Sequence, residues 1–135
     1  MTNQYGRAAV IATDKQRNGE CNSPREAWNK AIKTLTKSIY AQNKSCPRSA
    51  YLGLCEAGLV KGVPAGEYIT KLPKLNKGYA VKAVSELRKN SKLKNSPMEL
   101  WKLVIPKPKE FEKPKAHDSQ MDVVIALWEK RKIKR

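Results

Sequence analysis

Apolar residues recur at the spacing of an α-helix along most of the chain, and turn-forming residues separate the periodic stretches. Each stretch combines an apolar stripe with a polar face, as a helix packed in a bundle does. The pattern therefore predicts a single all-α domain over residues 1–135, a compact bundle of five or six helices. The expected helices cover residues 3–17, 23–40, 45–62, 76–89, 97–105 and 119–129.

The stretch 45–62 is expected to form the central buried helix, because it is the least charged long segment of a highly charged chain. Its apolar residues lie nearly all round a helix, which is typical of a helix packed on several sides. Pro47 suits the first turn, where a missing N–H is tolerated. Gly58 or Gly62 is expected to adopt the left-handed conformation that ends the helix.

Two helix starts share the sequence Asn-Ser-Pro-x-Glu-x-Trp, at residues 22–28 and 95–101. In both, the Ser is expected to cap the helix, the Pro to occupy its first position, and the Glu to complete a capping box. A duplicated half-domain is one explanation. Independent selection of good caps is the explanation we favour, because little else matches. Trp28, Trp101 and Trp128 are expected in the core.

Other boundaries are less clearly marked. The second helix is expected to end near Tyr40, with Ile39 on its apolar face, and Asn76 is expected to cap the fourth helix. Asp118 or Ser119 is expected to cap the last one. Residues 106–117 form a Pro/Lys-rich linker, which either straps across the fold with Phe111 as its anchor or simply spans to the last helix.

The net charge is the strongest global signal. The chain has 28 Lys and Arg against 12 Asp and Glu, a net charge of +16, whereas solubility requires only about 2 to 8 in a small domain. Such a field attracts polyanions. No apolar run reaches the roughly 20 residues of a membrane span, and three widely spaced cysteines indicate a reducing compartment. We expect a cytoplasmic protein without a membrane partner.

The basic residues gather in two segments that we expect to bind the polyanion. Residues 71–94 carry eight basic residues and one acid, Glu86, and the C-terminal segment 130–135 carries five basic residues. We hypothesise a non-enzymatic protein that binds DNA or RNA through the phosphate backbone. The alternative is an interaction module or small inhibitor that docks on an acidic protein. The candidate residues are Lys71, Lys74, Lys77, Lys82, Arg88, Lys89, Lys92, Lys94, Lys130, Arg131, Lys132, Lys134 and Arg135.

Catalytic and metal chemistry find little support in the sequence. The only histidine is His117, and the cysteines lack the spacing of zinc ligands, so we expect no metal and no cofactor. Cys46 lies at a predicted helix N-terminus, which can lower a thiol pKa, but His117 is its only candidate base. A thiol-dependent enzyme is therefore our third hypothesis. The glycine-containing loop 62–66 does not match a P-loop.

Four pieces of the sequence, at residues 23–28, 46–66, 79–84 and 119–130, resemble an uncharacterised family of small, single-domain bacterial and mobile-element proteins. The most specific piece is the block Cys-Pro-x-x-Ala-Tyr-Leu-Gly-Leu-Cys-Glu-x-Gly-Leu-Val-Lys-Gly. The resemblance implies a free-standing domain of unknown function, with no catalytic residues to carry over. Residues 131–133 depart from the Gly-Leu-Ile that the family is expected to have there, and make the C-terminus more basic.

Overall fold

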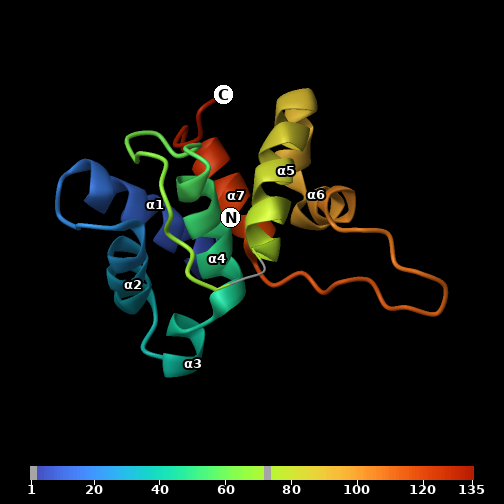
Figure 1. Cartoon of the computed structure of the whole chain (residues 1–135), viewed down its shortest axis with the longest axis horizontal. Coiled ribbons are helices and arrows are strands. Elements are labelled where there is room, and N and C mark those ends of the chain that lie inside the picture. Colours follow the sequence, from blue (N-terminus) through green and yellow to red (C-terminus); the bar gives the residue numbers. More distant parts are fainter. Residues whose placement is uncertain (1–2, 72–73) are drawn as a thin grey trace.

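The computed structural model describes residues 3–71 and 74–135, and shows the expected all-α bundle (Figure 1). None of the helices in this part of the chain is long and apolar enough to cross a bilayer. The basic segment 71–94 includes Leu72 and Pro73, which lie outside the described residues. The helices are α1 Gln4–Arg17, α2 Pro24–Leu35, α3 Ile39–Gln42, α4 Ser45–Glu56, α5 Leu75–Lys89, the 3₁₀-helix η1 Ser91–Asn95, α6 Pro97–Val104 and α7 Gln120–Glu129.

Helix α4 lies at the centre of the bundle, as the sequence predicts. Figure 1 shows it between α2 and α5, and it also contacts α1 and α7. Its Tyr51 ring is fully buried and stacks on Trp28, with the ring centroids 5.5 Å apart. Trp28, Trp101 and Trp128 are all in the core, at most 4% exposed. Burial of these aromatic rings supplies much of the hydrophobic stabilisation.

The serines of the two Ser-Pro-x-Glu motifs cap their helices as predicted, but the Glu side chains do not complete a capping box in the described structure, since the carboxylates of Glu26 and Glu99 pair with Lys30 and Lys102. Ser23 Oγ accepts a hydrogen bond from the Glu26 amide at 3.2 Å, and Ser96 Oγ accepts one from the Glu99 amide at the same distance. A proline occupies the first turn of both helices. Each cap satisfies an amide that has no partner within the helix.

The second helix is shorter than predicted, because it ends at Leu35 rather than near Tyr40. Thr36 adopts an extended conformation, and its Oγ1 accepts from the Ser38 amide at 3.2 Å. Ser38 in turn caps the separate helix α3. Local side-chain bonds of Ser and Thr thus compete with helix continuation. Ile39 and Tyr40 are consequently 68% and 77% exposed. The expectation that Ile39 lies on the apolar face of the second helix was therefore wrong.

Helix α4 also ends earlier than predicted, at Glu56 instead of Gly62. Gly58 has a φ of +73° and ends the helix in the predicted left-handed conformation. Gly62, at φ +79°, belongs to the turn that follows. The left-handed backbone at Gly58 reverses the chain, so that the residues after it pass back over Glu56.

The caps expected for α5 and α7 are not used. Asn76 is the second residue of α5 and does not cap it. Ser119 precedes α7 in a left-handed conformation and makes no side-chain cap bond, and Asp118 accepts from a lysine instead. The amide of Met121 donates to Nε2 of His117 at 3.1 Å. The imidazole of His117, four residues before Met121 in the sequence, therefore caps α7.

The linker 106–117 leaves the bundle as an extended loop (Figure 1). Phe111 is 98% exposed, so it does not anchor the loop on the fold, and the linker simply spans between α6 and α7. The loop rejoins the bundle at Lys115, whose carbonyl accepts a hydrogen bond from Trp101 Nε1 at 2.9 Å.

The C-terminal segment packs on the turn after α4. The Lys61 amide donates to the Lys132 carbonyl, and the Lys134 amide donates to the Leu59 carbonyl, both at 2.8 Å. Ile133 between them is fully buried. The backbone of this basic segment is therefore fixed rather than free.

Gly53 permits a close approach of α4 and α5. A Cβ at this position would lie 2.5 Å from the Cβ and 2.6 Å from the Cα of Lys77. Because one of these atoms belongs to the backbone, the clash could be relieved only by moving α5. Gly78, in contrast, lies on a side of α5 where an added Cβ would meet nothing within 4 Å.

These two glycines give a matched test of the packing. We expect Gly53→Ala to lower the free energy of unfolding by roughly 1–3 kcal/mol, the usual cost of overpacking. Gly78→Ala should raise it by about 0.5–1 kcal/mol, because alanine is the better helix former. Urea unfolding followed by circular dichroism measures both. Equal stability of the two variants would contradict the close approach.

Candidate anion-binding site

A buried carboxylate joins the end of α4 to the start of α5. The Glu56 side chain is only 2% exposed and accepts four hydrogen bonds. The backbone amides of Tyr68 and Ile69 donate to Oε2, both at 2.8 Å. The ammonium groups of Lys74 and Lys77 donate to Oε1 at 3.0 and 2.9 Å. Glu56 thus fixes the returning loop and the first turn of α5 on the central helix.

These donors keep Glu56 ionised despite its burial. Burial alone raises the pKa of this carboxyl, but the hydrogen bonds from Lys77, the Ile69 amide, Lys74 and the Tyr68 amide outweigh it. The result is a pKa of about 2, lowered from the ordinary 4.5. A buried carboxylate with this many donors is stable as an anion.

Beside this carboxylate lies a pocket of about 280 Å³, which we call the basic pocket. The starts of α2, α4 and α5 and the segment 69–71 line it. Hydroxyl groups of Ser45, Ser49 and Thr70 line it as well, and no carboxylate does among the described residues. Its five cationic side chains are Arg25, Arg48, Lys71, Lys74 and Lys77.

Two helix N-termini meet at the basic pocket. Ser45 is the first residue of α4 and Leu75 the first of α5, and both line the pocket. The N-cap residues, Lys44 and Lys74, make no side-chain cap bond. Among the described residues, the first amides of both helices thus have no side-chain cap, and the helix dipoles add positive potential to the pocket.

The two arginines of the pocket are not neutralised by the protein. In the described part of the chain, neither Arg25 nor Arg48 forms an ion pair with a carboxylate. Arg25 donates to the Tyr68 carbonyl at 3.4 Å. Burial first, and then the nearby charge of Arg25, lower the pKa of Arg48. The pocket thus holds positive charge that an anion can neutralise.

Three of the thirteen predicted site residues line this pocket, namely Lys71, Lys74 and Lys77. Arg25 and Arg48 were missed, although each follows the proline of a helix start, in Ser-Pro-Arg and Cys-Pro-Arg. That shared Pro-Arg pair was the signal in the sequence. It places a guanidinium in the first turn of each helix, and the two helices bring these turns to one pocket.

The remaining predicted residues lie elsewhere. Lys82 is exposed on α5, Lys89 lies 3.9 Å from Glu86, and Lys92 and Lys94 are exposed in η1. Residues 71–94 therefore do not form one continuous face, because α5, about 22 Å long, separates the basic residues at its N-terminus from Lys89, Lys92 and Lys94.

The C-terminal residues join the far end of α5. Arg88 donates to the Lys134 carbonyl at 2.6 Å, and the Lys132 ammonium lies 2.9 Å from an Asp14 carboxylate oxygen. The Arg135 guanidinium lies over the Trp128 ring, 4.0 Å from its centroid. Several of these charges hold the C-terminus in place. Lys130 and Arg131 are exposed.

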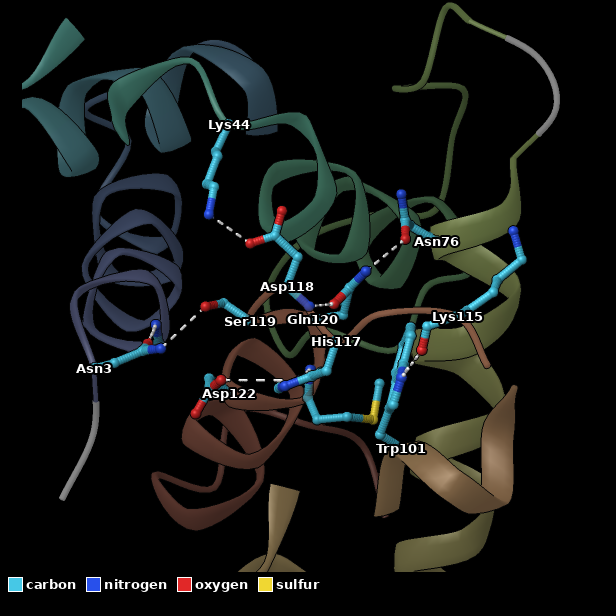
Figure 2. Close-up of polar contacts among 12 residues, drawn as sticks. Asn3, Lys44, Asn76, Trp101, Lys115, His117, Asp118, Ser119, Gln120 and Asp122 are labelled. Carbon is cyan, nitrogen blue, oxygen red and sulfur yellow. Dashed lines mark hydrogen bonds and ion pairs between the residues drawn. The ribbon is translucent and has the colours of Figure 1, made fainter. Parts of the chain in front are cut away.

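A second cluster of polar side chains connects the start of α7 with the residues that precede α1 and α4 (Figure 2). Lys44 pairs with Asp118 at 2.6 Å, and Asn3 donates to Ser119 at 3.2 Å. Burial lowers the pKa of His117, while nearby Asp122 and Asp118 oppose that shift. The lowered pKa suits a neutral imidazole that accepts the α7 amide. The cluster therefore has a structural role.

Two further candidates from the sequence are a metal site and the thiol of Cys46. Within residues 3–71 and 74–135, no three His, Cys, Asp or Glu side chains gather as metal ligands. Cys46 is the second residue of α4 and is partly exposed. Its candidate base, His117, already uses Nε2 as the acceptor for α7.

The role of Glu56 can be tested by an isosteric change. We expect Glu56→Gln to lower the free energy of unfolding by roughly 2–4 kcal/mol, because Lys74 and Lys77 lose their buried partner. The stability that Glu56 provides is complete above its ordinary pKa of 4.5 and is lost as the pH falls through about 2. The variant should therefore show a flatter pH dependence in that window.

The matched control is Glu99→Gln, whose carboxylate is 63% exposed in a surface pair with Lys102. We expect it to change stability by less than about 1 kcal/mol. Denaturant unfolding at a series of pH values measures both variants. Equal losses of unfolding free energy in the two variants would show that Glu56 does not hold the loop at 68–69 and the start of α5 on α4.

Comparison of the chain with known proteins identifies a family but no characterised relative. No curated protein and no solved structure gives a significant match to the chain. A family of unknown function (DUF6979) matches residues 2–134, nearly the whole chain. The expected resemblance to an uncharacterised family is thereby confirmed in its main point, and the chain belongs to this family of unknown function.

Proposed function

We propose that the protein binds DNA or RNA through backbone phosphates and that the basic pocket is the principal phosphate site. The observation that carries this proposal is the convergence of five cationic side chains and two uncapped helix N-termini on one pocket without a carboxylate in its lining. Guanidinium groups, hydroxyls and exposed backbone amides are the donors that phosphate prefers.

A polymeric ligand fits the charge better than a single small anion does. One phosphate neutralises at most two of the chain's sixteen excess charges. Lys82 on α5 and Lys92 and Lys94 in η1 are exposed outside the pocket, where further phosphates of a long strand can contact them as separate groups and a small anion held in the pocket cannot. The proposed role is binding rather than catalysis, because the carboxylate that joins Lys74 and Lys77 of the pocket, Glu56, is fully occupied by its four donors.

An acidic protein is the alternative partner, since carboxylates would use the same donors. The exposed side chains of Tyr40 and Phe111 favour it, because exposed aromatic residues are common anchors at protein interfaces. A backbone phosphodiester and a carboxylate each carry one negative charge, so charge alone does not choose between them. The meeting of two helix N-termini, a common site for phosphate groups, favours the phosphate. The binding experiment distinguishes the two partners.

The proposal is tested by fluorescence anisotropy with a labelled 20-residue oligonucleotide, single-stranded and duplex, over a salt series. We expect Arg25→Gln/Arg48→Gln to weaken binding roughly a hundredfold at moderate salt, about tenfold for each charged contact. The slope of log K against log salt should fall by about two units. Both substitutions keep a polar side chain and remove the guanidinium group with its charge, and at Arg25 also its bond to the Tyr68 carbonyl.

The control is Lys107→Gln/Lys109→Gln, which removes two charges from the exposed linker. It should weaken binding much less than the pocket variant, and circular dichroism should show both variants folded. Equal effects of the two would place the phosphate elsewhere. Failure of the wild type to bind either oligonucleotide at low salt, together with binding of labelled polyglutamate, would favour the acidic protein partner.

A further inference from the structure

A second pocket, of about 230 Å³, adjoins the basic pocket. Leu75 and Asn76, in the first turn of α5, line both of them and form their common wall. The second pocket is otherwise different in chemistry, because Tyr79 and Trp101 line it with aromatic rings. We call it the aromatic pocket.

The aromatic rings of this pocket are held in place. Trp101 Nε1 donates to the Lys115 carbonyl, which fixes the indole (Figure 2). The partly exposed Tyr79 packs edge-on against Trp101, with centroids 5.3 Å apart and planes at 80°. Trp101 itself is buried, and it supports the partly exposed Tyr79 ring, which offers a flat planar ligand a surface without much further loss of side-chain entropy.

An oriented amide lies at the boundary between the two pockets. Asn76 Oδ1 accepts a hydrogen bond from Gln120 Nε2 at 3.1 Å, and Gln120 Oε1 accepts from the Asp118 amide at 2.6 Å (Figure 2). This chain of bonds orients Asn76 and leaves its Nδ2 without a protein acceptor among the described residues. The amide can therefore donate to a ligand that spans the common wall.

We propose that the two pockets together bind one nucleotide unit of a single strand, with the phosphate in the basic pocket and the unpaired base in the aromatic pocket. This inference rests on the proposed function and specifies its ligand. A nucleotide joins an anionic phosphate to a planar base through a sugar, as the common wall joins the two pockets. In a duplex the bases are stacked and paired, so that none is free to enter such a pocket.

The inference predicts single-strand preference with little choice of sequence. Every base has a face that can stack, and stacking on an aromatic side chain typically contributes about one order of magnitude in affinity. One amide at the pocket's edge gives only limited discrimination between bases. The proposed ligand class is therefore single-stranded DNA or RNA of mixed sequence.

The test compares probes of equal charge. A labelled fifteen-residue oligothymidylate and the same backbone carrying abasic sites throughout are titrated by anisotropy at one salt concentration, with tripolyphosphate as a competitor. We expect the oligothymidylate to bind about tenfold more tightly than the abasic strand. Because the two strands carry the same phosphates, electrostatics alone predicts equal affinity.

Variants locate the base. Tyr79→Leu should remove most of the difference between the two probes, whereas Tyr79→Phe, which keeps the ring, should retain it. Tyr40→Leu is the control, since Tyr40 is exposed on α3, away from both pockets. The comparison of the two probes on the wild-type protein needs no variant, so it stands even if Tyr79→Leu unfolds.

The outcomes separate the two proposals. Equal binding of both probes, competed by tripolyphosphate, would overturn the base site and leave the phosphate site intact. If the wild-type protein binds neither the oligothymidylate nor the abasic strand, the proposed function itself is overturned. Selective binding of the oligothymidylate that Tyr40→Leu abolishes and Tyr79→Leu does not would overturn the placement of the base.

Discussion

The ionised Glu56 is the interaction on which the arrangement of the pocket depends. A carboxylate that is 2% exposed carries a large desolvation cost, and four donors from two segments of the chain offset it. Those donors bring the loop at 68–69 and the first turn of α5 onto the central helix. Since Glu56 supplies a single negative charge against five cationic side chains, it organises the pocket while leaving it strongly positive.

Much of the fold is predictable from the sequence, because local signals and burial agree there. Ser23 and Ser96 cap their helices as the Ser-Pro-x-Glu motif predicts, and the three tryptophans lie in the core. The errors lie where tertiary contacts override propensity. Asn76 orients toward Gln120 instead of capping α5, and α7 takes His117 as its cap, which no spacing rule for caps includes.

The candidate site was only partly predictable. Density of lysines in the sequence indicates Lys71, Lys74 and Lys77, but Arg25 and Arg48 come from helices whose starts converge only in three dimensions. Likewise, Glu56 sits in the least charged segment of the chain, where one acid in an apolar stretch gives no hint of its lysine partners. Charge density along the chain shows how much charge is present, whereas packing decides which charges gather.

The most direct measurement of the central claim is a backbone amide NMR titration of the ¹⁵N-labelled protein with a short single-stranded oligonucleotide. If phosphate binds between the two helix N-termini, the largest shift changes fall on the first turns of α4 and α5, at Ser45 and at residues 75–77, and the C-terminal segment changes little. Changes that instead concentrate in the linker 106–117 or in residues 130–135 would contradict the account.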